Sequence, residues 1–341
     1  MRKARNVTIK DVAKKAGVSI STVSRAFNDY SDIKPETRKK ILKIAEEIGY
    51  SPSLLARGMR TSNSRRIAIG IEDYDVAKPN YSFLYKIIMG FKEYASKQGY
   101  EVVFLPNLTK NNKNKLPRIV QDNYLDGIFL MGLKLSDEFY KQVLKGDIPC
   151  VLFDIPINKG KVGFVGTDNI KGTSLAMDYL IRNGHRKIAF INGHENAYVS
   201  LQRLDGYYLS LMKNEIPIDK TLIYFGDFTE KSGRDGIRKL FNEHNDITAV
   251  FAASDLMAIG AITELREMGK KIPEEIEVIG FDDIELSSYV SPKLSTIRQD
   301  TYKLGTSAAT LLINIINGQQ INKIVIEPEL VLRESTRNKN A

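Results

Sequence analysis

The chain has 341 residues, 43% hydrophobic and 27% charged, which fits two or three folded domains and excludes a largely disordered protein. Fifty Lys and Arg residues against 41 Asp and Glu give a formal net charge of +9, and the single cysteine excludes a disulfide framework or a multi-cysteine zinc site. The charged start, MRKARNVTIKDVAKK, does not fit a secretory signal, and no apolar run reaches membrane-spanning length. We therefore expect a cytoplasmic protein that does not enter a membrane.

The positive charge lies almost entirely in the N-terminal fifth of the chain. Residues 1–66 contain 16 Lys and Arg but only 6 Asp and Glu, a net charge of +10, whereas the remaining 275 residues carry a net charge of −1. A basic segment of this kind predicts a polyanionic partner. Its apolar residues recur at helical spacing, which indicates a small folded module and not a charged tail.

Three short helices are predicted in this basic segment. Thr8 and Asp11 form a capping-box-like start, and Gly17 supplies the left-handed turn that ends the first helix. Ser19 can cap a second helix, and Pro35 suits the first turn of a third. A helix, a tight turn, a second helix and a covering helix make the helix-turn-helix pattern, in which the second helix enters the DNA major groove.

The outward side chains of the second helix are of types that can bind DNA bases and phosphates. Arg25 can pair with guanine, Ile20 can contact a thymine methyl group, and small hydroxyl side chains allow close approach to phosphates. The alternative is a three-helix bundle that contacts protein, and the charge of the segment disfavours it.

The run TIKDVAKKAGVSISTVSRAFN, from Thr8 to Asn28, closely resembles the DNA-binding motif of the lactose/galactose repressor (LacI/GalR) family of bacterial transcription regulators. The resemblance continues through Pro35–Arg38 and Ile48–Pro52. It implies that a few side chains read bases and that others hold phosphates. The implied base-reading residues are Ile20, Ser21 and Arg25, and the implied phosphate contacts are Thr8, Ser19, Thr22, Ser24 and Asn28.

Residues 51–65 are predicted to be a linker in the absence of DNA. The stretch Ser53–Arg60 makes only two helical turns, and Gly58 costs it roughly 1 kcal/mol relative to alanine. In the family the matching segment becomes helical on operator binding, and a leucine wedges into the minor groove. Met59 occupies that leucine's place, so the resemblance adds Ser53 and Met59 to the expected DNA contacts.

From Arg66 onward, short apolar runs alternate with helical stretches, which predicts buried parallel strands in two similar α/β subdomains, each doubly wound. The runs are Ile67–Ile71, Val102–Leu105, Gly127–Met131 and Cys150–Phe153 in one set, and Ile188–Ile191, Leu222–Phe225, Ala249–Ala252 and Glu277–Gly280 in the other. Ligands of such folds bind beyond the carboxyl ends of the strands.

The family resemblance covers nearly the whole chain and implies a periplasmic-binding-protein-like core with crossovers near 166, 297 and 325. It also implies a homodimer that binds a pseudo-palindromic operator. The expected organisation is a helix-turn-helix domain over 1–50, a hinge over 51–65 and an effector-binding and dimerisation core over 66–341. Within the core, we expect one subdomain over about 66–166 plus 298–325 and another over about 167–297 plus 326–341.

Polar residues at strand ends are the candidate effector contacts, since carboxylates and guanidinium groups bind sugar hydroxyls and aromatic rings stack on sugar C–H faces. Asp154 and Asp282 follow buried runs, and Phe83 lies near the exit of the first strand. The resemblance implies further contacts, and the full set is Phe83, Asp154, Asp168, Arg203, Phe228, Ser254 and Asp282.

Structural alternatives remain open for several of these residues. Asp168 and Asp255 could cap helices, Arg203 could form an ion pair between lobes, and Phe228 could be core packing. Thr301 replaces an aromatic residue of the lactose repressor pocket, so lactose-type ligands are not implied.

No catalytic constellation is evident, so we expect neither an enzyme nor a cofactor. Asp282 and Asp283 are adjacent and point in opposite directions, and the three histidines lack metal-ligand spacing. We predict a nucleoid-associated repressor of carbohydrate genes, controlled by a sugar or sugar phosphate bound between the lobes. The alternatives are control by a phosphoprotein coregulator or a purine-like corepressor and, more distantly, a transport-type sugar-binding protein.

Overall fold

The structure is a computed structural model that describes residues 7–27, 30, 32–50, 64–72, 81–106, 108, 115–135, 137–145, 147–157 and 159–337. The chain divides into two compact units, Met1–Ser64 and Arg65–Ala341, which are treated separately below. Three predicted DNA contacts, Asn28, Ser53 and Met59, lie outside the described residues, as does most of the predicted hinge.

The N-terminal unit contains the three helices expected from the sequence: α1 (Ile9–Ala16), α2 (Ile20–Phe27) and α3 (Pro35–Glu47). The backbone amide and the hydroxyl of Thr8 both donate to the Asp11 carboxylate, at 2.8 and 2.7 Å, and Gly17 ends α1 with a φ of 70°. All three helices contribute to a small apolar core, formed by Val12, Ala13, Ala16, Val23, Ala26, Ile41 and Ala45. This packing leaves Ile20, Ser21 and Arg25 of α2 exposed.

The first sheet of the larger unit has six strands in the order β11-β5-β4-β3-β1-β2, and its neighbouring strands pair in parallel. The strands are β1 (Arg66–Ile71), β2 (Glu101–Pro106), β3 (Gly127–Met131), β4 (Cys150–Phe153), β5 (Val162–Thr167) and β11 (Lys323–Ile326). Helices α5 (Tyr81–Lys97) and α12 (Thr301–Ile316) pack in one apolar layer against it. Helices α6 (Leu116–Asp122) and α7 (Glu138–Lys145) pack in another.

The second sheet also has six strands, in the order β12-β10-β9-β8-β6-β7. The strands are β6 (Ile188–Asn192), β7 (Ile223–Phe225), β8 (Ala249–Ala252), β9 (Glu277–Asp282), β10 (Ser295–Arg298) and β12 (Glu329–Val331). Its helices are α8 (Asn169–Arg182), α9 (Tyr198–Lys213), α10 (Glu230–Glu243) and α11 (Asp255–Glu267), with short 3-10 turns η1 (Lys220–Leu222) and η2 (Glu285–Ser288). Edge strand β12 pairs antiparallel with β10, an addition to the predicted parallel pattern.

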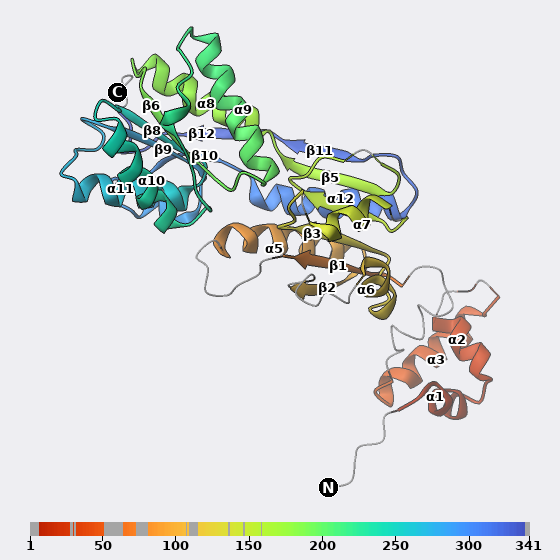
Figure 1. Cartoon of the computed structure of the whole chain (residues 1–341). Coiled ribbons are helices and arrows are strands. Elements are labelled where there is room, and N and C mark those ends of the chain that lie inside the picture. The colour runs from red at the N-terminus through yellow and green to blue at the C-terminus, as the bar shows by residue number, and fades with distance from the viewer. Residues whose placement is uncertain are drawn as a thin grey trace. The chain divides into compact units, whose positions relative to one another are not determined.

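The chain passes between the two sheets three times, after β5, after β10 and after β11 (Figure 1). Each crossing leaves the carboxyl end of a strand. Hydrogen bonds connect the crossings to one another. The Asp168 amide donates to the Ile326 carbonyl at 3.1 Å, and the Thr167 hydroxyl donates to Gln299 Oε1 at 2.6 Å. The ends of strands from both sheets are therefore held close together.

At the opposite, amino edge of the second sheet, Glu277 is fully buried at the start of β9. Burial raises its pKa, but hydrogen bonds from His185, Arg337 and Asn183 outweigh burial and hold the pKa at about 2. The donors include Arg337 Nε at 2.6 Å and Asn183 Nδ2 at 3.0 Å. Because Arg337 lies beyond the last strand, this ion pair fastens the C-terminal segment to the sheet.

We predict that Arg337→Ala lowers the free energy of unfolding by about 1–3 kcal/mol at pH 7, because it removes a donor from a buried carboxylate. The lowered pKa means that Glu277 contributes stability above about pH 4.5 and loses it as the pH falls toward 2, so the difference should shrink in acid. Urea unfolding followed by circular dichroism measures both effects. The control is Arg182→Ala, since Arg182 is exposed and donates only to the Asp178 carbonyl of its own helix. Equal losses in the two variants would contradict the prediction.

Candidate DNA-binding and effector sites

One surface of α2 combines hydroxyl groups with exposed apolar and cationic side chains. The Ser19 hydroxyl caps the helix by accepting from the Thr22 amide at 3.1 Å, and it lies 2.7 Å from the Ser21 hydroxyl. Ile20 has 44% of its surface exposed although it is apolar. Thr22 and Ser24 are half-buried, and Thr8 is exposed at the start of α1. The predicted contacts on α2 are thus exposed or half-buried, and none is fully buried.

Arg25, the predicted guanine reader, has a partner in the absence of DNA. Its Nη1 atom lies 2.5 Å from Asp32 Oδ2, and its guanidinium lies 5.9 Å from the centre of the Tyr30 ring. Both side chains of the ion pair remain about half exposed. Asp32 therefore holds Arg25 in a defined place, and a base or phosphate would have to replace that carboxylate.

Three of the predicted effector residues, Asp154, Arg203 and Asp282, come together at the carboxyl ends of the two sheets. Arg203 is buried on α9 with its guanidinium 3.8 Å from the centre of the Phe281 ring. Its Nη2 atom lies 4.0 Å from Asp282 Oδ1 at the end of β9. The charge of Arg203 also acts on the carboxyl of Asp154, which follows β4 of the other sheet.

The two carboxyl groups near Arg203 have raised pKa values. Burial raises the pKa of Asp154 to about 7, against the opposing charge of Arg203 and with a further increase from the charge of Asp282. Burial also raises the pKa of Asp282, although Arg203 and a 2.7 Å hydrogen bond from Gln299 Nε2 oppose it. Asp154 Oδ1 is buried without a hydrogen-bond partner. Both residues have positive φ, 60° for Asp154 and 118° for Asp282, a strained backbone that is common at functional sites.

Asp168 and Ser254 act as helix caps at the same edge. Asp168 Oδ1 accepts from the Lys171 amide at 2.9 Å, and Ser254 Oγ accepts from the Met257 amide at 3.3 Å. Asp255, for which capping was the other interpretation, instead accepts hydrogen bonds from the Ile284 amide, Ser287 and Thr296. Its Oδ2 atom therefore holds the segment after β9, and its Oδ1 atom holds β10.

The two predicted aromatic contacts are half-buried at the margins of their own subdomains. Phe228 lies so close over Gly193 that a Cβ there would collide with the ring, and it contacts His194 edge-on with ring centres 5.9 Å apart. Phe83 lies 6.3 Å from Phe153, measured between ring centres. Each ring packs against the core of its own sheet, so packing accounts for part of each side chain.

Comparison with known proteins identifies the family. A model described as bacterial regulatory proteins, lacI family, matches residues 8–53, and one described as a periplasmic binding protein-like domain matches residues 177–336. The HTH-type transcriptional regulator CelR of Thermobifida fusca is 32% identical over 98% of this chain and 100% of its own. The chain belongs to the LacI family.

Solved structures of LacI-family proteins share the whole architecture. The transcriptional regulator CelR–cellobiose complex covers 97% of this chain and 100% of its own, with 30% identity and a TM-score of 0.73. The lac repressor dimer bound to operator and the anti-inducer ONPF covers 97% of this chain and 99% of its own, with 26% identity and a TM-score of 0.82. The present protein is accordingly a DNA-binding transcriptional regulator with two parallel-sheet subdomains and an N-terminal helix-turn-helix domain.

In this LacI-family chain, two polar residues near the effector candidates, Gln299 and Asn169, were not predicted from the sequence. Gln299 joins the second crossing to the site, because it accepts from Thr167 at 2.6 Å and donates to Asp282 at 2.7 Å. Asn169 accepts from Arg203 Nε at 2.9 Å and donates to the Thr167 carbonyl at 3.1 Å. Each lies one or two residues beyond the end of a strand that leads into a crossing. A polar residue at such a position is the sequence signal that could have identified them.

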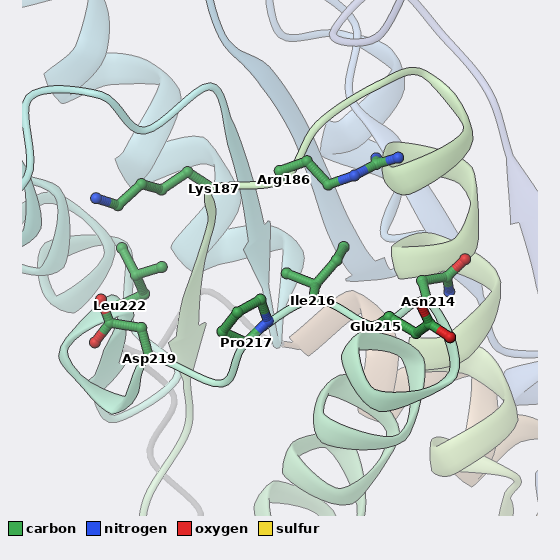
Figure 2. Close-up of a pocket in the computed structure, with 8 residues that line it drawn as sticks. All are labelled: Arg186, Lys187, Asn214, Glu215, Ile216, Pro217, Asp219 and Leu222. Atoms are coloured by element: carbon green, nitrogen blue, oxygen red, sulfur yellow. The ribbon is translucent and has the colours of Figure 1, made fainter.

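Two pockets of the larger unit lie at opposite edges of the second sheet. One, of about 320 Å³, is lined by residues that follow β3, β6 and β7, namely Lys134, His194, Glu195, Asn196, Phe225 and Gly226, and so belongs to the carboxyl edge. The other lies at the amino edge (Figure 2). There Arg186 and Lys187 point in opposite directions, and Lys187 is paired with Asp246 at 2.8 Å, so the two cations form no common anion site.

No group of three or more His, Cys, Asp or Glu side chains that could hold a metal ion is found in the part of the chain that the structure describes. In the same part, every helix is too short or too polar to cross a membrane.

We predict that Asp154→Asn raises the thermal stability of the ligand-free protein at pH 8 by about 1–3 kcal/mol and has little effect near pH 4. The pKa of Asp154 is about 7 in the folded chain, above its unfolded value. The free energy of unfolding of the parent protein therefore falls as the pH rises from about 4 through 7. The side-chain amide in the Asp154→Asn variant cannot ionise, so the variant keeps this stability. Melting temperatures at several pH values measure the effect.

Asp246→Asn is the matched control, because it removes an exposed carboxylate whose pKa is lowered by its hydrogen bond with Lys187. It should give no gain at pH 8. An Asp154→Asn variant that is no more stable than the parent protein at pH 8 would show that ionisation of this buried carboxyl has no cost.

Proposed function

We propose that this LacI-family regulator represses carbohydrate-utilisation genes and is released from, or fixed on, its operator by a sugar-like effector. In this proposal residues 1–50 read the operator, 51–65 connect the two units, and 66–341 bind the effector and dimerise. The observation that carries the proposal is the convergence of Asp154, Arg203 and Asp282 from both subdomains at the carboxyl ends of the sheets.

The chemistry of this cluster suits a polyhydroxylated ligand. Carboxyl oxygens of Asp154 and Asp282 can accept hydrogen bonds from hydroxyl groups, and the Arg203 guanidinium can donate to hydroxyl oxygens. The half-buried Phe228 ring offers an apolar face at the same edge. The solved CelR structure is a complex with cellobiose, which supports a saccharide as the class of effector.

The three crossings couple the effector candidates to the arrangement of the two subdomains. Gln299 and Asn169 connect Asp282 and Arg203 directly to residues at two of the crossings. A ligand that contacts both sheets prefers one arrangement of the subdomains and shifts the population toward it. The operator affinity of the dimer then depends on which arrangement of the subdomains the effector favours.

The proposed homodimer has a candidate interface on the second subdomain. Tyr289 and Leu286 have 75% and 45% of their surface exposed although they are large and apolar. They lie beside a groove of about 500 Å³ lined by Ile259, Ile262, Thr263, Arg266, Glu267, Val290 and Ser291. Exposed apolar residues next to a groove are typical of a protein interface, and a two-fold dimer would present two α2 helices to a pseudo-palindromic operator.

We predict that Arg25→Ala weakens binding to a selected operator by about 10–100-fold and leaves binding to unrelated DNA nearly unchanged, because a base contact carries sequence specificity. Fluorescence anisotropy with labelled duplexes measures both affinities, and operator affinity should fall steeply with salt as counterions are released. Lys15→Ala is the control: it removes the same charge and also breaks an ion pair, with Glu47 of α3, but Lys15 lies on α1 and is not one of the predicted base contacts. An affinity that does not change with salt would exclude the proposed DNA contact.

We predict that Tyr289→Glu converts the dimer to a monomer at micromolar concentration, because it places a charge in an apolar interface. Analytical ultracentrifugation measures the mass, and operator affinity should fall together with dimerisation. Met212→Glu is the control, since Met212 is 64% exposed on α9, away from the Tyr289 groove. A Tyr289→Glu protein that stays dimeric would place the interface elsewhere.

A further inference from the structure

We propose that Asp32 is a specificity-determining residue of the DNA-binding unit. Its carboxylate keeps the guanidinium of Arg25 from DNA phosphates and leaves it to a base that offers two acceptors. This role rests on the proposed function, because Arg25 is the residue proposed there to contact a base. It extends that function to a residue outside α2, in the segment that leads to α3.

The position of the Arg25 side chain is set by two residues that follow its helix. Arg25 lies in the last turn of α2, and its Nη1 donates to Asp32 Oδ2 at 2.5 Å, across seven positions of the chain. Both side chains stay about half exposed, at 55% and 49% of their surface. The Tyr30 ring adds a weaker contact, because its centre lies 5.9 Å from the guanidinium carbon.

The Asp32 carboxylate has no other partner in the described part of the unit. An aspartate shortly before a helix commonly caps it, but the N-cap residue of α3 is Lys34 and no side-chain hydrogen bond caps that helix. Among the described residues, the side chain of Asp32 makes one ion pair, with Arg25. An exposed pair of this kind changes a folding equilibrium by less than about fivefold. Its main consequence is therefore the charge and position of Arg25.

The carboxylate acts differently on the two kinds of DNA acceptor that Arg25 can reach. A phosphate that takes the place of Asp32 brings a second negative charge beside it, and like charges repel. Guanine presents O6 and N7 as a pair of acceptors on an uncharged base, so it replaces the carboxylate without that repulsion. Asp32 therefore disfavours phosphate contacts by Arg25 more strongly than guanine contacts.

Other cations of the same unit are not restrained in this way. Lys39, Lys40 and Lys43 of α3 are exposed and have no ion pair among the described residues. They are available for contacts with phosphates whatever the sequence of the DNA. On unrelated DNA Arg25 accordingly stays with Asp32 and releases no counterion, whereas at the operator it is transferred to a base.

The test measures two affinities of the full-length Asp32→Asn protein by fluorescence anisotropy. One duplex is the operator selected from random sequence by the parent protein, and the other has the same length with the selected site shuffled. Asp32→Asn should bind the shuffled duplex about tenfold more tightly at low salt, with a salt dependence steeper by about one phosphate contact. Operator affinity should change by less than about threefold, so the ratio of the two affinities falls.

A double substitution shows whether the gain depends on Arg25. Arg25→Ala combined with Asp32→Asn should return the affinity for the shuffled duplex, and its salt dependence, to those of Arg25→Ala alone. Glu47→Gln is the matched control, because Glu47 is also a half-exposed carboxylate of this unit and is paired with Lys15 at 3.3 Å. It removes the same charge, so its gain measures the charge alone, and Arg25→Ala should not cancel that gain.

Three results would overturn the role of Asp32. The first is an equal gain from Asp32→Asn and Glu47→Gln, or a gain from Asp32→Asn that persists without Arg25. The second is an unchanged ratio of operator affinity to shuffled-duplex affinity. The third is loss of binding to both duplexes together with a lower melting temperature, which would show that the carboxylate is needed for folding of the unit.

Arg25→Ala in the parent protein separates this role from the proposed function. If Arg25→Ala weakens operator binding while Asp32→Asn behaves like Glu47→Gln, the proposed base contact stands and the role of Asp32 alone is overturned. If the parent protein selects no DNA sequence, the proposed function itself is overturned, and the role of Asp32 in sequence specificity with it.

Discussion

The architecture of the larger unit depends on one constraint: the chain crosses between two sheets three times, and each crossing leaves the carboxyl end of a strand. Parallel strands place their carboxyl ends at one edge, so the crossings bring that edge of one sheet to that edge of the other. Side chains that belong to different subdomains, such as Asp154 after β4 and Arg203 on α9, thereby come within electrostatic range. The crossings also restrict motion of the two subdomains to rearrangements that three short connections allow.

Arg203 shows how a buried charge is maintained at such an edge. Its guanidinium is buried away from water, which costs free energy unless neighbouring groups hydrogen-bond to it or neutralise its charge. An amide oxygen, a backbone carbonyl, an aromatic face and a carboxylate surround it. The partners come from α8, the segment after β8, and β9, so the arginine joins elements that are distant in sequence. Loss of this residue would leave buried polar groups without partners, in addition to removing the effector contact proposed for it.

The polar residues at the strand ends do not all have one role. Asp168 and Ser254 satisfy the first amides of helices, and Asp255 holds the segment after β9 in place. Asp154 differs from them because, among the described residues, its buried Oδ1 has no hydrogen-bond partner. This difference supports the effector contact proposed for Asp154, since buried polar atoms usually have a partner.

The sequence by itself determined the three N-terminal helices and eight of the twelve described strands, because helical spacing, glycine turns and continuous apolar runs are local signals. Strands β5, β10, β11 and β12 were not among the predicted runs. The sequence also determined the concentration of positive charge in residues 1–66 and the candidates at strand ends. Tertiary structure alone decided which candidates act together. Gln299 and Asn169 contact Asp282 and Arg203 across long stretches of chain, and Arg25 is paired with Asp32 beyond the end of its own helix. The reason is physical: hydrogen bonding, burial and charge neutralisation depend on neighbours that only the folded chain brings together.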